Sequence, residues 1–199
     1  MRPSRPRRAP AVVAVLAAAA VAIAACGEGD RGVTGPSANA AAPPDLSSEG
    51  LRAELARNVR EGDRIVGEGR EAFDRRLEAL RGHPVVVNQW ASWCESCRFE
   101  FSFFADAARR YRAEVAFVGL DSQDDRGGAE EFLEELPVGF PSIFDRDAEI
   151  AAAYGGGQAW PTTIFFDRAG EVAHVKIGAY ATAELLDEDI ERYALGTEG

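Results

Sequence analysis

The feature that most constrains this chain is a run of β-branched residues that leads directly into a close pair of cysteines and then into a helical pattern. Residues 84–90 read PVVVNQW, an uninterrupted stretch of the kind found in buried parallel strands. Cys94 and Cys97 come next, and residues 97–111 have the apolar spacing of a helix. The sequence therefore predicts that the cysteine pair lies at a strand-to-helix junction.

This position gives the two cysteines a chemical role. A helix N-terminus carries unpaired N–H groups and a positive partial charge, which stabilise a thiolate and lower the thiol pKa. Cys94 precedes the helix, so it is the predicted nucleophile that attacks a substrate disulfide. Cys97 lies one turn further along on the same side and is predicted to resolve the mixed disulfide. The pattern favours thiol–disulfide exchange.

Two structural alternatives for the pair are half of a zinc site and a plain structural disulfide. Zinc usually binds four nitrogen or sulfur ligands, and the other candidates, His83 and His174, are isolated from each other in the sequence. There is no second CxxC motif, so we expect no metal. We also expect no cofactor, since no G-x-G-x-x-G motif that would bind NADPH follows a predicted strand.

The start of the chain has the pattern of an export signal. A basic beginning is followed by residues 11–25, which are apolar, uncharged and shorter than the roughly 20 residues that a membrane-spanning helix needs. Residues 23–26 (IAAC) resemble the bacterial lipobox, in which the signal is cut before a cysteine that then carries diacylglycerol. We predict that residues 1–25 are a lipoprotein signal peptide and that Cys26 is lipidated. The alternatives are a retained short anchor and an ordinary thiol.

Charge and cysteine usage narrow the partners further. The net charge is -11, and cleavage before Cys26 removes four arginines and no acidic residue. Such an acidic chain is repelled by nucleic acid, so nucleic-acid binding is not expected. With Cys26 lipidated, a single cysteine pair remains, which is a working redox centre rather than a disulfide framework.

The rest of the chain divides into a tether and one domain. Residues 26–46 are rich in Gly, Pro and Ala and predict a flexible tether, and residues 47–199 predict the folded domain. The further helices are predicted over 46–60, 71–81, 128–136, 147–154 and 182–195, and the further strands over 114–120, 140–144, 162–166 and 172–177. Alternating strands and helices that end in a hairpin and a helix indicate an α/β domain with a mixed sheet.

Residues 84–195 resemble the extracytoplasmic thioredoxin-like proteins of the TlpA/ResA type. The blocks that carry the resemblance are PVVVNQWASWCESC, VAFVGLDSQDD, FPSIFDRDAEIAAAYG and WPTTIFFDRAGEVAHVKIGAY, in the family's order. The resemblance implies a thioredoxin-like fold, with a central mixed β-sheet flanked by helices and an extra βα insertion before Pro161. It also implies a lipid-anchored protein on the outer face of the bacterial cytoplasmic membrane.

The resemblance also assigns site residues. Pro161 matches the cis-proline that faces the two cysteines, and Trp160 would offer its backbone to an extended substrate. Trp93 is expected to be partly exposed at the site and to bind substrate, whereas Trp90 is expected in the core. Glu100 matches a glutamate near the cysteines that relays protons or raises the cysteine pKa values. The alternative for Glu100 is a solvated helix residue.

Some residues depart from the family's pattern. The dipeptide between the cysteines is Glu95-Ser96, where many relatives have proline second. Asn88 stands at the position of thioredoxin's buried aspartate, which removes a proton acceptor. Residues 155–157 are all glycine and lengthen the loop before Pro161. The redox potential therefore does not carry over from relatives.

Several functions use this arrangement of residues. The leading hypothesis is a reductase of protein disulfides, for which the resemblance implies apocytochrome c as substrate and a membrane thiol reductant as electron donor. An oxidase or isomerase would use the same residues at a higher potential. A peroxidase of the peroxiredoxin kind is disfavoured, because Ala91 stands where its threonine is usual. A non-enzymatic binding module is disfavoured, because both cysteines are retained.

Overall fold

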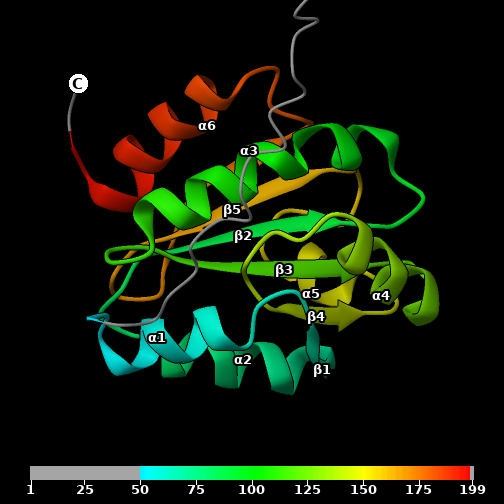
Figure 1. The fold of residues 1–199 in the computed structure, drawn as a ribbon, viewed down its shortest axis with the longest axis horizontal. Helices are drawn as coiled ribbons and strands as arrows, with labels where there is room; N and C mark the ends of the chain where they lie inside the picture. Colours follow the sequence, from blue (N-terminus) through cyan, green and yellow to red (C-terminus); the bar gives the residue numbers. More distant parts are fainter. Residues whose placement is uncertain (1–49, 198–199) are drawn as a thin grey trace, which may run out of the picture. The chain divides into compact units, whose positions relative to one another are not determined.

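The computed structural model describes residues 50–197, which form a six-stranded mixed sheet covered by helices on both faces (Figure 1). The predicted signal peptide (1–25), the tether (26–46) and Cys26 lie outside the described residues. No helix within the described range has both the length and the apolar character needed to cross a membrane.

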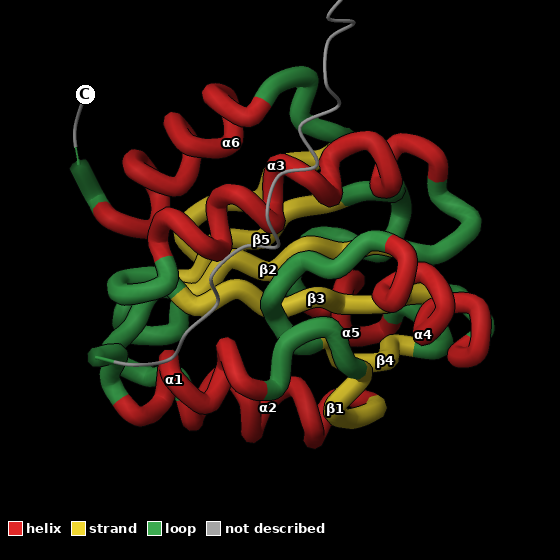
Figure 2. The backbone as a smooth tube through the Cα atoms, in the orientation of Figure 1, coloured by secondary structure: helices red, strands yellow, loops and turns green. Residues whose placement is uncertain are grey.

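Helices and strands alternate along most of the chain, and Figure 2 shows the strands gathered between the helices. The strands are β1 (Ile65–Glu68), β2 (Val85–Trp90), β3 (Ala116–Ser122), β4 (Ser142–Asp145), β5 (Thr162–Phe166) and β6 (Val172–Ile177). The helices are α1 (Ala53–Arg60), α2 (Gly69–Ala79), α3 (Glu95–Tyr111), α4 (Arg126–Glu135), α5 (Glu149–Ala153), α6 (Ala183–Asp189) and the π-helix η1 (Ile190–Leu195).

The strand order is β1-β4-β3-β2-β5-β6. Strands β1, β4, β3 and β2 run parallel to one another. Strand β5 pairs antiparallel with β2, and β6 pairs antiparallel with β5. The carboxyl ends of β2, β3 and β4 therefore meet at one edge, which is also where β5 begins. In open α/β sheets this edge is where functional residues gather.

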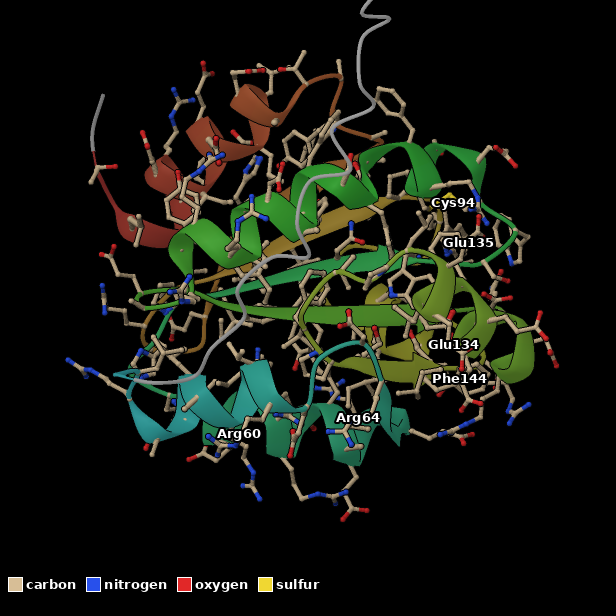
Figure 3. All side chains as sticks on the ribbon, viewed as in Figure 1. Arg60, Arg64, Cys94, Glu134, Glu135 and Phe144 are labelled. Carbon is tan, nitrogen blue, oxygen red and sulfur yellow. A yellow bond between two sulfur atoms is a disulfide. The ribbon has the colours of Figure 1, made fainter. Side chains whose placement is uncertain are left out.

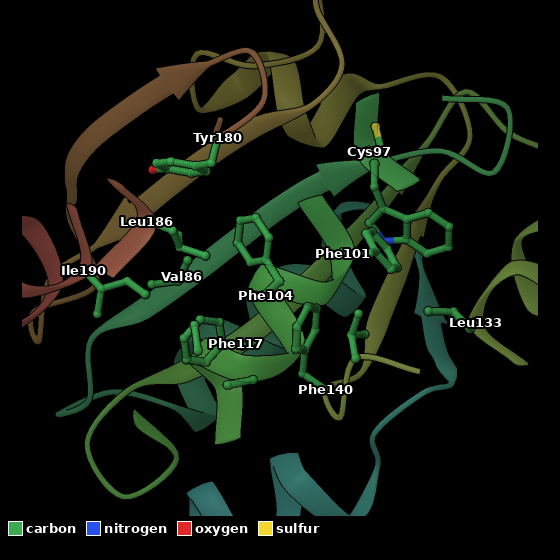
Figure 4. Close-up of a cluster of buried hydrophobic side chains, with 14 of the residues drawn as sticks. Val86, Cys97, Phe101, Phe104, Phe117, Leu133, Phe140, Tyr180, Leu186 and Ile190 are labelled. Carbon is green, nitrogen blue, oxygen red and sulfur yellow. The ribbon is translucent and has the colours of Figure 1, made fainter. Parts of the chain in front are cut away.

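Alternation along the strands divides the core into two layers. Val86, Phe117 and Phe165 pack with α3, α4 and α6, and Figure 4 shows this layer around Phe104. Residues of the opposite parity pack with α1, α2 and α5 on the other face. In Figure 1, α3 and α6 cover one side of the sheet while α1 and α2 cover the other.

Three details differ from the sequence prediction. Strand β1 was not predicted, since its four residues, which include Gly67, are too short for a periodic signal. The first helix begins at Ala53 rather than at residue 46. The last helix is not uniform: it changes to a π-helix at Ile190. The hairpin between β5 and β6 is confirmed, with Asp167 Oδ1 accepting from two backbone N–H groups of its turn.

Candidate active site

The cysteine pair lies at the strand-to-helix junction that the sequence predicts. Cys94 and Cys97 are joined in a disulfide, so the structure shows the oxidised form. Cys94 is the N-cap residue of α3, and its sulfur accepts a hydrogen bond from the Cys97 N–H at 3.1 Å. Figure 3 shows Cys94 at the N-terminal end of α3. The same N–H is placed to stabilise a thiolate at Cys94 once the disulfide is reduced.

The two cysteines differ in accessibility. Cys94 is 5% exposed and Cys97 is fully buried, and Figure 4 shows Cys97 at the border of the core beside Phe101. An incoming thiol therefore reaches Cys94 more easily than Cys97. This difference supports the division of roles that the sequence suggests, with Cys94 as nucleophile and Cys97 as resolving residue.

Two tryptophans flank the disulfide, and both are anchored to the end of β3. The Trp93 indole N–H donates to the Gln123 carbonyl at 2.9 Å, and the Trp160 indole N–H donates to the Ser122 carbonyl at 3.2 Å. Their ring centroids are 5.5 Å apart. Trp93 is 56% exposed, which confirms the expectation that it is partly exposed. The pair forms an aromatic surface next to the reactive sulfur.

The peptide bond between Trp160 and Pro161 is cis, as the family resemblance implies. The segment is connected to the cysteine loop through Ser96, whose hydroxyl lies 3.4 Å from the Trp160 carbonyl oxygen and 3.4 Å from the Cys94 sulfur. On its other side, the Pro161 carbonyl accepts from the Gly178 N–H at 2.9 Å. The departure at Ser96 from the proline of many relatives thus provides a polar link between the two halves of the site.

The glycine-rich loop before Pro161 is held by the buried side chain of Gln89. The Gln89 side-chain oxygen accepts from the Gly157 N–H at 2.8 Å. A Cβ added at Gly156 would lie 2.5 Å from that same oxygen. The buried glutamine and the glycines therefore fit each other.

Glu100 is fully buried, which excludes the solvated alternative. Its Oε1 accepts from Asn88 Nδ2 at 2.8 Å, and its Oε2 accepts from the Tyr180 backbone N–H at 2.9 Å. Burial raises the pKa of Glu100 to about 7, although both hydrogen bonds and the charge of Lys176 act in the opposite direction. Glu100 therefore changes its charge near neutral pH, one helical turn after Cys97.

The role of Asn88 could not be recognised from the sequence. It stands where thioredoxin has a buried aspartate, which removes an acceptor, and the structure shows that its amide donates to Glu100 instead. A second carboxylate at this place would repel Glu100, whereas the neutral amide holds it.

Asp121 is a buried carboxyl group that the sequence analysis did not single out. It is the penultimate residue of β3, opposite Trp90 of β2. It is fully buried, and neither of its oxygens has a hydrogen-bond partner among the described residues. Burial and the nearby charge of Asp124 raise its pKa to about 9. Asp124 in turn accepts from the hydroxyl (2.8 Å) and the backbone N–H of Ser92, which fixes the loop before Cys94.

We expect Asp121→Asn to stabilise the protein at pH 7. Because the folded-state pKa is raised, the stability linked to Asp121 is present below about pH 4 and is lost as the pH rises towards 9. At pH 7 the wild type must protonate Asp121 to fold, which the amide does not need, so the gain is on the order of 1–3 kcal/mol at pH 7 and fades by pH 4. Urea unfolding at both pH values tests this, with exposed Asp147→Asn as the control. An equal gain at both pH values would contradict it.

The described residues contain no group of three or more His, Cys, Asp or Glu side chains arranged to hold a metal ion. His174 instead stacks on Tyr193, with ring centroids 3.9 Å apart. His83 is buried two residues before β2 begins, and burial lowers its pKa.

The Redoxin family model matches residues 71–190, which include the cysteine pair, Glu100 and the cis-proline. The chain belongs to the Redoxin family. Within it, the chain is 30% identical over 124 residues to thiol-disulfide oxidoreductase ResA of Geobacillus kaustophilus, covering 62% of this chain and 68% of that protein. It is 28% identical to ResA of Bacillus subtilis, over 56% of this chain and 62% of the relative. This Redoxin is thus a thiol–disulfide oxidoreductase of the TlpA/ResA type.

Solved structures agree with this assignment. A secreted disulfide oxidoreductase of Mycobacterium tuberculosis, described as homologous to E. coli DsbE, has a TM-score of 0.51 and 26% identity, covering 57% of this chain and 84% of its own. A DsbF homologue from Corynebacterium diphtheriae has a TM-score of 0.51 and 27% identity, covering 58% and 74%. The predicted thioredoxin-like fold is confirmed.

Proposed function

We propose that this Redoxin is a lipid-anchored reductase of protein disulfides on the outer face of the bacterial cytoplasmic membrane. The observation that carries the direction of electron flow is the buried carboxyl group of Glu100, one turn after Cys97 on α3. A negative charge beside the pair disfavours thiolates and raises their pKa. In strongly oxidising proteins of this kind, the reduced dithiol form is stabilised. A cysteine pair whose reduced form gains little from thiolate stabilisation is therefore expected to be a reductant.

The two ends of the site then act differently on the two sulfurs. The Cys97 N–H and the helix terminus favour a thiolate at Cys94, which supports nucleophilic attack from the surface. Glu100 and full burial favour the protonated thiol at Cys97. Once the mixed disulfide forms on Cys94, loss of the Cys97 proton releases the reduced substrate and closes the Cys94–Cys97 disulfide. Glu100 is a suitable acceptor for that proton, because its pKa is about 7.

The surface around Cys94 supports an extended polypeptide as substrate. Trp93 and Trp160 provide an aromatic surface, and the cis-Pro161 segment offers backbone groups beside the disulfide. We propose apocytochrome c as the substrate, since its haem-binding cysteines form a disulfide that must be reduced. Electrons would come from a membrane thiol reductant. After removal of the signal peptide over 1–25, the lipid on Cys26 and the tether over 26–46 would hold the domain within reach of that donor.

The reduction potential of the Cys94–Cys97 couple tests this proposal. We expect a value near or below roughly −270 mV, like that of thioredoxin, when the purified protein is equilibrated with thiol redox buffers. A value near about −120 mV would overturn the reductase and support a disulfide oxidase, for which the N-cap position of Cys94 would be the decisive feature. The absence of a reversible two-electron couple would favour the binding module.

A further inference from the structure

Lys176 is the only lysine in the chain, and it lies on β6, the edge strand next to β5. It is half-buried, and its ammonium group donates to the carbonyl oxygens of Gly178 and Ala179, the latter at 2.9 Å. The same ammonium lies 4.4 Å from the centroid of the Tyr180 ring. The cation is therefore fixed against one short backbone segment, residues 178–180.

One peptide group connects this cation to Glu100. The Ala179 carbonyl and the Tyr180 N–H belong to the same planar amide. Its oxygen accepts from Lys176 at 2.9 Å, and its N–H donates to Glu100 Oε2, also at 2.9 Å. A cation on the oxygen withdraws electrons from the amide and makes the N–H a stronger donor, because linked hydrogen bonds polarise one another.

We propose that Lys176 is a positioning residue that holds the Ala179–Tyr180 peptide against Glu100 and strengthens its hydrogen bond to the charged carboxylate. The ammonium charge lowers the pKa of Glu100 directly as well, in opposition to burial. Lys176 thus keeps Glu100 able to release its proton near neutral pH. The consequence for thiol exchange rests on the proposed function, whereas the effect on Glu100 itself does not.

The other groups that face Glu100 do not replace this effect. Asn88 on β2 donates to Glu100 but carries no charge. Tyr180 is held by a hydrogen bond from its hydroxyl to Asp189 on α6 at 2.9 Å. Burial and the charge of Asp189 raise the pKa of Tyr180 well above its ordinary value, so the phenol stays neutral while Glu100 titrates. The oxidised cysteines do not titrate.

The same segment also touches the substrate side of the site. The Gly178 N–H donates to the Pro161 carbonyl at 2.9 Å, and the Gly178 carbonyl accepts from Lys176. Lys176 therefore holds in place a loop that contacts both the cis-proline and the buried carboxylate. Loss of this interaction is expected to loosen the loop, so the test must separate the electrostatic effect from a merely structural one.

A single lysine makes a direct test possible without any mutation. In the full-length oxidised protein labelled with 13C-lysine, one side-chain Cε resonance arises, and we expect it to show a titration step near pH 7. The step must vanish in Glu100→Gln, which separates it from any response to His174 on the same strand. A Cε resonance that does not change with pH between 5 and 9, or a step that persists in Glu100→Gln, would overturn the link.

Two variants then separate charge from packing. In Lys176→Met we expect the pKa of Glu100, measured from its 13C carboxyl resonance in the oxidised protein, to rise by about half a unit or more. In Lys176→Arg, which keeps a cation and several donors, we expect a pKa close to that of the wild type. Circular dichroism verifies that both variants fold. An unchanged pKa in folded Lys176→Met, or an equal rise in both variants, would contradict the proposal.

The consequence for the reaction is measured separately. If the proposed function is correct, the pH profile of disulfide reduction in Lys176→Met moves to higher pH together with the pKa of Glu100. A shift of the Glu100 pKa without a shift in the pH profile would retain the link between Lys176 and Glu100 but reject the role of Glu100 in proton transfer. An unchanged Glu100 pKa would reject the link, whatever the activity.

Discussion

Replacing Cys94 by serine is expected to abolish disulfide reduction, whereas replacing Cys97 by serine is expected to yield a protein that accumulates mixed disulfides. Cys94 is the more accessible sulfur and accepts the hydrogen bond at the N-terminus of α3. A serine hydroxyl there is a far weaker nucleophile than a thiolate, so the rate falls by at least about 1000-fold. Without Cys97, attack by Cys94 still occurs, but nothing within the pair displaces the substrate.

Mass spectrometry after reaction with a disulfide-bonded peptide distinguishes the two variants. Cys97→Ser should gain the mass of one peptide half, and reductant should remove it. Cys94→Ser should remain unmodified at Cys97, because that thiol is fully buried. Exposed Ser102→Ala on α3 serves as the control: it keeps both cysteines and is expected to retain turnover. Adduct formation on Cys94→Ser alone would reverse the assignment of nucleophile and resolving residue.

The sequence predicts the fold and the cysteine pair well, because both depend on local patterns. The apolar run of β2, the cysteines and the helical spacing of α3 follow one another directly, and they define the junction that the chemistry requires. Family resemblance adds the cis-proline, whose position depends on the strand that follows it. By contrast, β1 forms a strand because it pairs with β4, which is distant in the sequence. Its own four residues carry no pattern that predicts this pairing.

The polar groups inside the site are harder to predict, for a physical reason. Glu100 has the sequence context of an ordinary surface helix residue, and its burial results from partners 12 and 80 residues away, Asn88 and Tyr180. The raised pKa of Asp121 likewise depends on its buried position in the sheet rather than on its neighbours in sequence. Helical spacing predicts which face of the helix a residue lies on. The desolvation of that residue depends on the segments that cover this face, and tertiary packing determines which segments these are.

Glu100 should leave a measurable signature in the stability of the oxidised protein. Its folded-state pKa of about 7 lies above the ordinary value of 4.5, so the folded state binds this proton more tightly than the unfolded state. The stability that it contributes is fully present below about pH 4.5 and is lost as the pH rises through 7. Glu100→Gln cannot lose a proton, so its stability relative to the wild type should rise by up to about 3 kcal/mol between pH 4.5 and 8.

The change with pH is the informative quantity, rather than the stability difference at one pH. A glutamine amide meets two donors, from Asn88 and Tyr180, and satisfies only one of them with its oxygen, which costs about 1–3 kcal/mol at every pH. Urea unfolding of the oxidised protein from pH 4.5 to 8 separates this constant cost from the pH-dependent gain. Exposed Glu134→Gln on α4 should show no such trend. If Glu100→Gln and wild type differ by the same amount throughout, Glu100 is charged over the whole interval and cannot take up the Cys97 proton near neutral pH.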